Sequence, residues 1–393
     1  MTAYRQALES LRLQRGDARA LARAAAAADP ESVPARLLEA TVLVLSREVR
    51  DFEAAGWAFA PLARLVENAH VGALAAALDS DLGLACRIYD EILATDPDDF
   101  LALWAAQLMD YFSGNADAMR TRSARVLALR PEDHAVVSMH AFALQECGLY
   151  AEATNTALRA LELEPRDLRA EHAVLHVYEM RGEAAGALRW AAPRANDWHG
   201  AHHMWWHLAL FMTTLERPGA ALALYDQKFR DDTLAVLIDA SALLWRLQLQ
   251  GVEVGRRFTP LAARWAAHAE DAHCAFNDLH AMMAFAGAQR FDLAERLLAA
   301  QERRLTRPFG ANFHMTRLVG HPACRALAAY GRGDFRGAEA LLRSLPPVAH
   351  RIGGSHAQRD ILQLTRAAAA ARRSNPTRGE NHVFALSQRL AAA

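Results

Sequence analysis

Histidines in this sequence stand near other polar side chains at the spacing of a helix. His172, His176 and Glu179 are separated by four and three residues, so one face of a helix would carry all three. His203 and His207 repeat the four-residue step. A helix that presents two such side chains one turn apart offers two ligands to a metal ion, or an acid and a base to a substrate.

A third polar group occupies the segment "FNDLHAMMAF". Asn277 and His280 would share a helical face one turn apart, with Asp278 beside them. Bulky neighbours such as Trp206 and Met282 would supply the apolar wall that is usual in small-molecule sites. The sequence has no HExxH motif, so the common arrangement of zinc proteases is absent.

The segment "RIGGSHAQRD" (351–360) permits two interpretations. Ser355 and Gln358 fit a capping box, S-x-x-Q, which would start a helix after the two glycines. The N–H groups at a helix start also form an anion site, and Arg359 would then serve as a bidentate partner for a carboxylate. Ser355 as a nucleophile is disfavoured, because the segment is not a GxSxG elbow.

These groups define three candidate sets. The candidate catalytic residues are His172, His176, Glu179, His207, Asp278 and His280. The candidate ligand-binding residues are His203, Trp206, Asn277, Ser355, Gln358, Arg359 and Asp360. The candidate ligands of a divalent metal, Zn or Fe, are His176, Glu179, His207 and His280.

A structural role is the alternative for all three sets. A histidine on an apolar helix is more often a hydrogen-bonded core residue than a metal ligand, and a buried polar network can fix one packing arrangement without binding anything. In the segment 239–258, Asp239 and Arg246 could face a groove, although we expect Arg246 to pair with a carboxylate. Substitution of His207 would separate the two roles, since a structural histidine affects stability alone.

A 34-residue repeat indicates how these side chains are positioned. Three prolines stand 34 residues apart, at Pro97, Pro131 and Pro165, and three glycines keep the same step, at Gly114, Gly148 and Gly182. Prolines and glycines that both recur every 34 residues are typical of tetratricopeptide units, in which glycine takes a positive φ at the turn between two helices. We expect each proline to open the next helix, where its missing N–H costs nothing.

Helix pairs are expected to continue beyond the strict repeats. The segments 217–226, 289–298 and 331–342 each read as a turn followed by the second helix of a pair, and no segment alternates with the period of a strand. The predicted fold is all-α, a right-handed superhelix of degenerate tetratricopeptide helix pairs. We expect a helical cap over 1–70, a superhelical array over 71–345 and closing helices over 346–393, forming one continuous solenoid whose final short helix follows residue 380.

Composition excludes several classes of protein. The 393 residues carry 44 basic and 45 acidic side chains, without the basic face that a nucleic-acid binder needs, and the 52% hydrophobic content excludes disorder. The four cysteines form no CxxC pair, which favours a reduced chain with small buried thiols. We see neither a signal peptide nor a bilayer-spanning run, so we expect a soluble cytoplasmic protein, for which a dimer is permitted.

Several segments together resemble the tetratricopeptide repeat protein 38 family. The resemblance covers roughly residues 80 to 370 and includes "PDDFLALWAAQLMDYFSG", "AEHAVLHVYEM", "AHHMWWHLALF", "SALLWRLQLQGVEVGRRF", "FNDLHAMMA" and "IGGSHAQRD". It implies an α-superhelix and a shared site that includes the histidine groups, but no established reaction. The sequence departs from the pattern at His356, where some members carry Asn, and at Phe258, where others carry Trp.

Two functions compete on this evidence. The first is the binding of a small ligand in an enclosed concave pocket lined by His, Glu, Asp and Arg. In this function the protein would also catalyse a reaction on the ligand with the help of a metal. Residues 172, 207, 280 and 359 would then converge as the superhelix curls. The alternative is a non-enzymatic adaptor that binds a peptide segment of a partner protein along an open groove. The clustered histidines and bulky aromatic neighbours favour the pocket.

Overall fold

A computed structural model describes residues 2–374, and every regular element in that part of the chain is a helix. The chain divides into two compact units. The first contains the residues up to Val177 together with Phe309–Ala311, and the second contains Tyr178–Pro308 and the residues from Asn312 onward. The expected final helix beyond residue 380 lies outside the described residues.

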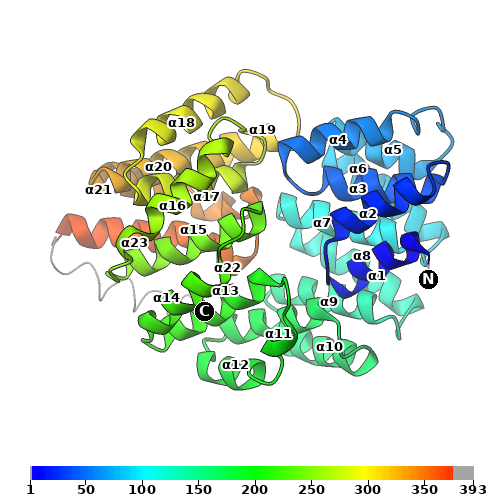
Figure 1. Cartoon of the computed structure of the whole chain (residues 1–393), viewed down its shortest axis with the longest axis horizontal. Coiled ribbons are helices and arrows are strands. Elements are labelled where there is room, and N and C mark those ends of the chain that lie inside the picture. The colour runs from blue at the N-terminus through cyan, green and yellow to red at the C-terminus, as the bar shows by residue number, and fades with distance from the viewer. Residues whose placement is uncertain (1, 375–393) are drawn as a thin grey trace. The chain divides into compact units, whose positions relative to one another are not determined.

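The first unit is a succession of helices that pack on their neighbours in sequence, as α5 packs on α6 and α9 packs on α10 (Figure 1). Its helices are α1 (Ala3–Leu13), α2 (Ala18–Ala28), α3 (Val33–Val44), α4 (Val49–Phe59), α5 (Ala69–Leu78), α6 (Leu82–Thr95), α7 (Phe100–Ser113), α8 (Ala116–Leu129), α9 (His134–Glu146), α10 (Tyr150–Leu163) and most of α11 (Leu168–Met180). The expected helical pairs therefore exist in this region.

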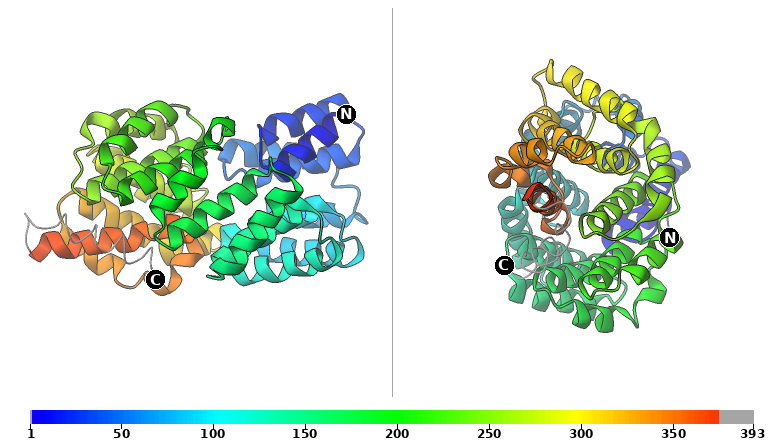
Figure 2. Two further views of the ribbon diagram at one scale, coloured as in Figure 1. Left: turned by 90° about the horizontal axis from the view of Figure 1, so that it is seen from below. Right: turned by 90° about the vertical axis from the view of Figure 1, so that its left-hand side faces the viewer.

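The second unit continues with helix pairs, in which α13 packs on α14 and α20 packs on α21, and Figure 2 gives two further views of the ribbon. Its helices are α12 (Ala184–Ala191), α13 (His202–Thr214), α14 (Pro218–Lys228), α15 (Leu234–Leu249), α16 (Phe258–Trp265), α17 (Ala275–Gly287), α18 (Phe291–Leu305), α19 (Ala311–Met315, whose first residue belongs to the first unit), α20 (His321–Gly331), α21 (Phe335–Leu342), α22 (His356–Arg359) and α23 (Ile361–Ser374). Helices α14, α18 and α21 are the second helices predicted at 217–226, 289–298 and 331–342.

The periodic glycines occupy the turns as predicted, whereas the periodic prolines do not open helices. Gly114 ends α7 with φ +73°, and Gly148 follows α9 with φ +76°. Pro97 lies in the turn three residues before α7 begins at Phe100. The helix starts instead at Asp99, whose side chain accepts a hydrogen bond from the backbone N–H of Ala102 at 2.9 Å.

The same correction applies to the other two repeats. Asp133 caps α9 by accepting from the N–H of Ala135 at 3.1 Å, and Asp167 accepts from the N–H of Ala170 at 3.1 Å at the start of α11. Pro131 and Pro165 each lie in the preceding turn. An aspartate is suited to this position, because its carboxylate satisfies N–H groups that have no partner within the helix.

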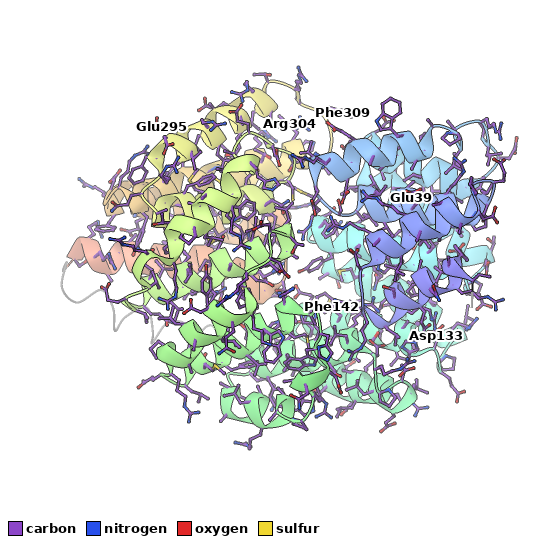
Figure 3. All side chains as sticks on the ribbon, viewed as in Figure 1. Glu39, Asp133, Phe142, Glu295, Arg304 and Phe309 are labelled. Carbon is purple, nitrogen blue, oxygen red and sulfur yellow. The ribbon has the colours of Figure 1, made fainter. Side chains whose placement is uncertain are left out.

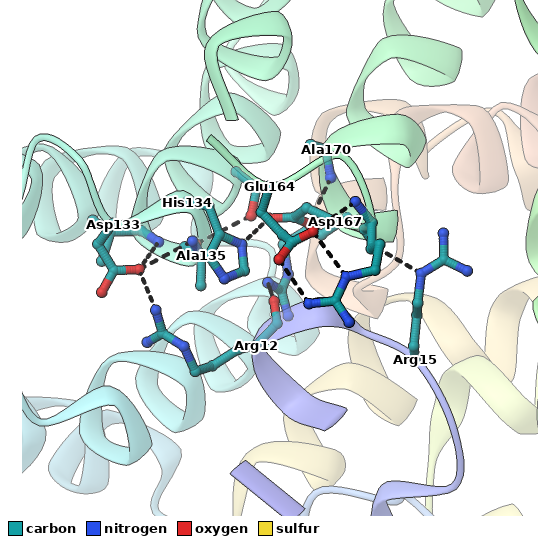
Figure 4. Close-up of polar contacts among 12 residues, drawn as sticks. Arg12, Arg15, Asp133, His134, Ala135, Glu164, Asp167 and Ala170 are labelled. Atoms are coloured by element: carbon teal, nitrogen blue, oxygen red, sulfur yellow. Dashed lines mark hydrogen bonds and ion pairs between the residues drawn. The ribbon is translucent and has the colours of Figure 1, made fainter. Parts of the chain in front are cut away.

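Helix α1 is bound to the start of α9 and to the start of α11 within the first unit (Figure 4). Arg12 Nη2 donates to Asp133 Oδ1 at 2.7 Å. The buried guanidinium of Arg169 donates to the carbonyl oxygen of Leu11 at 2.9 Å, near the C-terminal end of α1. The capping aspartate Asp133 therefore serves both its own helix and the attachment of α1.

Two further sequence expectations can be compared with the structure. Cys86 and Cys324 are buried, whereas Cys147 and Cys274 are half-buried, and all four thiols are unpaired with one another. Among residues 2–374, none of the helices combines the length and the apolar content that crossing a bilayer would require.

Candidate functional site

Glu179 and His207 form a short acid–imidazole contact in the second unit. Helix α11 carries Glu179 near its C-terminal end, α13 carries His207, and Nδ1 of the imidazole lies 2.6 Å from Oε2 of the carboxyl. Burial raises the pKa of Glu179 to about 7 and lowers the pKa of His207 well below its usual range. Both shifts favour the neutral forms of the two groups.

His203 stands one turn before His207 on α13 and has a carboxylate partner of its own. Its Nδ1 lies 2.9 Å from Oδ1 of Asp239 on α15. The His203 ring stacks on Trp206, with centroids 5.1 Å apart and planes inclined by 12°, and its centroid is 4.9 Å from that of His207. The two contacts fix the orientation of the His203 ring.

Four imidazoles form a group that could hold a metal ion. One nitrogen from each of His172, His176, His203 and His207 lies within 4.8 Å of the others. His172 and His176 are one turn apart on α11, with ring centroids separated by 4.4 Å, and Phe142, labelled in Figure 3, stacks on His172. Histidine nitrogens are the commonest ligands of transition metals in proteins.

Both histidines of α13 have a carboxyl partner, as metal-binding histidines usually do. A ligating imidazole almost always places its second nitrogen against a carboxylate or a carbonyl, which fixes the tautomer and orients the ring. His207 has Glu179 at Nδ1, and His203 has Asp239 at Nδ1. In both rings the bonds at Nδ1 leave Nε2 as the atom that would face an ion.

Arg246 joins α15 to the segment between α22 and α23. Its Nη1 donates to Oδ2 of Asp360 at 3.2 Å, and its Nη2 donates to the second carboxylate oxygen and to the carbonyl oxygen of Ala357. The sequence prediction that Arg246 pairs with a carboxylate is confirmed. Its guanidinium also lies over the Trp206 ring, with Cζ 5.7 Å from the centroid.

A cavity of about 360 Å³ in the second unit, called here the Glu179 cavity, lies beside these residues. Charged and titratable groups contribute part of its wall, namely Glu179, Arg246, His350, His356, Arg359, Asp360 and Arg366. Apolar groups contribute another part, namely Leu210, Phe211, Leu342, Pro346, Leu362 and Leu364. This volume lies within the range of about 300–1,000 Å³ that is usual for small-molecule sites.

The 351–360 segment has the capping geometry that the sequence suggested. Ser355 and Gln358 form a capping box at the start of the four-residue helix α22, and the Ser355 N–H donates to Gln358 Oε1 at 3.0 Å. Arg359 donates to the carbonyl oxygen of Gly354. Because Gln358 already occupies the Ser355 N–H, the anion site predicted at this helix start is not formed by that group. Arg359 and Asp360 line the Glu179 cavity instead.

The third predicted group lies apart from both the cavity wall and the four imidazoles. Helix α17 buries Asp278, which accepts a hydrogen bond from Gln301 Nε2 at 3.0 Å, and the fully buried His280, whose Nδ1 lies 2.7 Å from the carbonyl oxygen of Phe276. Asn277 is buried on the same helix. None of these three residues lines the Glu179 cavity or belongs to the group of four imidazoles.

Some residues of the site were absent from the sequence-derived sets. Arg246 and Asp239 appeared in the sequence only as polar positions within an apolar helix, and Arg366 gave no signal. A buried charge on a helix as apolar as α15 is the one clue that could have identified the first two, because such a charge requires a partner. No protein-family model matches the chain.

Proposed function

We propose that this chain is a helical-repeat protein that binds a small molecule in the Glu179 cavity, where Glu179 gives a proton to the ligand or takes one from it. The observation that carries the proposal is the convergence of Glu179, Arg246 and Asp360 from three distant segments on one cavity. A carboxyl group whose pKa is raised toward neutrality by burial suits proton transfer near neutral pH. The apolar wall would hold the remainder of the ligand.

A substitution that fills the cavity tests ligand binding. Ala349 lines the cavity and is half-buried, so Ala349→Trp adds bulk there, whereas Ala220 is exposed on α14 and provides Ala220→Trp as a matched control. The purified proteins would be dialysed against a metabolite mixture, and the retained small molecules would be quantified by mass spectrometry. We expect near-stoichiometric retention in the parent and the control, and loss in Ala349→Trp. Equal retention in all three, or none in the parent, would contradict the proposal and favour a peptide-binding adaptor.

We further propose that the four imidazoles hold a divalent metal, Zn or Fe, that assists the reaction. The close approach of their nitrogens and the carboxylates at Nδ1 of His203 and His207 support this assignment. Glu179 would then orient His207 as well as face the cavity. Within this proposal the metal supplies Lewis acidity, and the residues of the cavity bind and orient the ligand.

Elemental mass spectrometry of untagged protein, purified without chelator, tests the metal. The double variant His176→Ala/His207→Ala should lose metal, while His199→Ala/His314→Ala, which removes two exposed histidines, should keep it. Zn(II) added after dialysis against chelator should raise the melting temperature of the parent protein, because an ion that binds the folded chain stabilises it. A metal-free parent whose melting temperature does not respond to Zn(II) or Fe(II) would refute the metal proposal while leaving the cavity proposal intact.

A further inference from the structure

The charged residues around the Glu179 cavity have a net positive charge. Arg246 and Asp360 neutralise one another as an ion pair. Arg366 also lines the cavity and makes no ion pair among the described residues. Arg359 adds a second guanidinium to the wall and donates to the carbonyl oxygen of Gly354. Such a wall attracts a negative charge, because a guanidinium in a partly desolvated site is stabilised by an anion.

Arg246 also presents a donor that the protein does not satisfy. Its two terminal nitrogens are engaged by Asp360 and by the carbonyl oxygen of Ala357, while its Nε has no hydrogen-bond partner among the described residues. The Arg246 side chain is only 6% exposed and lines the cavity. A buried donor without an acceptor is unfavourable, so the site is complete only when an acceptor enters the cavity.

The rest of the cavity wall indicates which kind of molecule supplies that acceptor. Leu210, Phe211, Leu342, Leu362 and Leu364 form an apolar lining that suits a hydrocarbon chain. A phosphate would require several donors around its oxygens, and the backbone N–H at the start of α22 is already occupied by Gln358. A carboxylate needs fewer donors, and guanidinium groups match its planar geometry.

We propose that the ligand of the Glu179 cavity is a small carboxylic acid with an aliphatic tail, bound through its carboxylate to Arg246 Nε and to the guanidinium group of Arg366. This inference rests on the proposed function and names the class of ligand for the same site. The tail lies against the leucines and Phe211, and the carboxyl group of Glu179 faces the bound molecule from α11.

Calorimetric titration with three probes of one chain length tests the charge and shape of the ligand. Hexanoate, hexanamide and hexyl phosphate share the six-carbon chain and differ in the head group. We expect the parent protein to bind hexanoate at least about tenfold more tightly than hexanamide, as one charge-assisted hydrogen bond implies, and more tightly than hexyl phosphate. Arg366→Gln should reduce the ratio between hexanoate and hexanamide, and Arg336→Gln, which removes an exposed arginine of α21 outside the cavity, should leave it unchanged.

A paired substitution avoids leaving a buried charge alone. Arg246→Gln/Asp360→Asn removes both members of the ion pair, so the variant should fold, and its preference for hexanoate over hexanamide should be smaller than that of the parent. Equal binding of the two probes by the parent, tighter binding of hexyl phosphate, or no binding of hexanoate would overturn the carboxylate inference. The proposed function would fail separately, in the retention experiment with Ala349→Trp, because that measurement depends on no particular head group.

Discussion

Asp278 should make the stability of the second unit depend on pH. Its side chain is 3% exposed on α17, and the Gln301 amide donates to its carboxylate from α18. Burial, with a smaller contribution from the charge of Asp271, raises the pKa of Asp278 from 3.8 to about 7. Asp278→Asn keeps the size and an acceptor for Gln301 but cannot ionise, so comparing it with the parent isolates the effect of the buried charge.

The direction in which stability changes with pH follows from how tightly the folded and the unfolded chain bind this proton. The raised pKa means that the folded chain binds this proton more tightly than the unfolded chain, so the stabilising contribution is complete below pH 3.8 and is lost as the pH rises toward 7. A pKa difference of roughly three between the folded and the unfolded chain corresponds to about 4 kcal/mol in the free energy of unfolding, once the carboxyl group is fully ionised. The advantage of Asp278→Asn over the parent should therefore grow by about 2–3 kcal/mol between pH 5 and pH 8.

Urea unfolding followed by tryptophan fluorescence measures this difference. Six of the eight tryptophans lie between residues 178 and 308, so the signal comes mainly from the second unit. Glu295→Gln is the matched control, because Glu295 is exposed on α18 (Figure 3) and its substitution changes the net charge by the same amount. A constant difference between Asp278→Asn and the parent at the two pH values, or a variant less stable than the parent at pH 8, would show that Asp278 is not held neutral by burial.

Other substitutions test the turns, the capping box and the buried ion pairs. Gly148→Ala should destabilise the chain by about 1 kcal/mol in urea, because φ is +76° there, whereas Gly219→Ala in α14 should stabilise it by about 0.5–1 kcal/mol. Gln358→Ala removes the acceptor of a buried backbone N–H and should cost about 1–3 kcal/mol, seen as a lower midpoint in thermal unfolding. Arg122→Met leaves two carboxylates of the first unit without their shared cation, and calorimetry should record a loss of about 3–5 kcal/mol.

Local rules account for the parts of the fold that the sequence predicted. Gly148 was identifiable because a residue with positive φ is strained unless it is glycine, whatever surrounds it. The prolines were misassigned because their fixed φ suits both a first helical turn and the loop before it. Asp99 and its counterparts in the next two repeats decide between these positions, since the helix starts where a carboxylate accepts the first N–H groups.

The site was only partly predictable, because its contacts join residues that are far apart in the sequence. His207 and Glu179 are 28 residues apart, and Arg246 and Asp360 are 114 residues apart. Helical spacing placed each histidine on a face, but it could not show which face of another helix would meet it. His280 illustrates the limit: its spacing resembles that of His176, yet its Nδ1 lies against a carbonyl oxygen of its own helix.

Some polar groups cap helices and others lie buried within them, and this difference indicates where chemistry is expected. In the repeats of the first unit, Asp99 and Asp133 cap helices, so their positions follow the 34-residue period. In the second unit, Asp239 and Arg246 lie within α15, a helix that is buried on nearly every side, and each has a partner outside α15. A helix needs no charged residue in its interior, and burying one is unfavourable without a partner. Arg246 also lines the Glu179 cavity, so it is the position to substitute first.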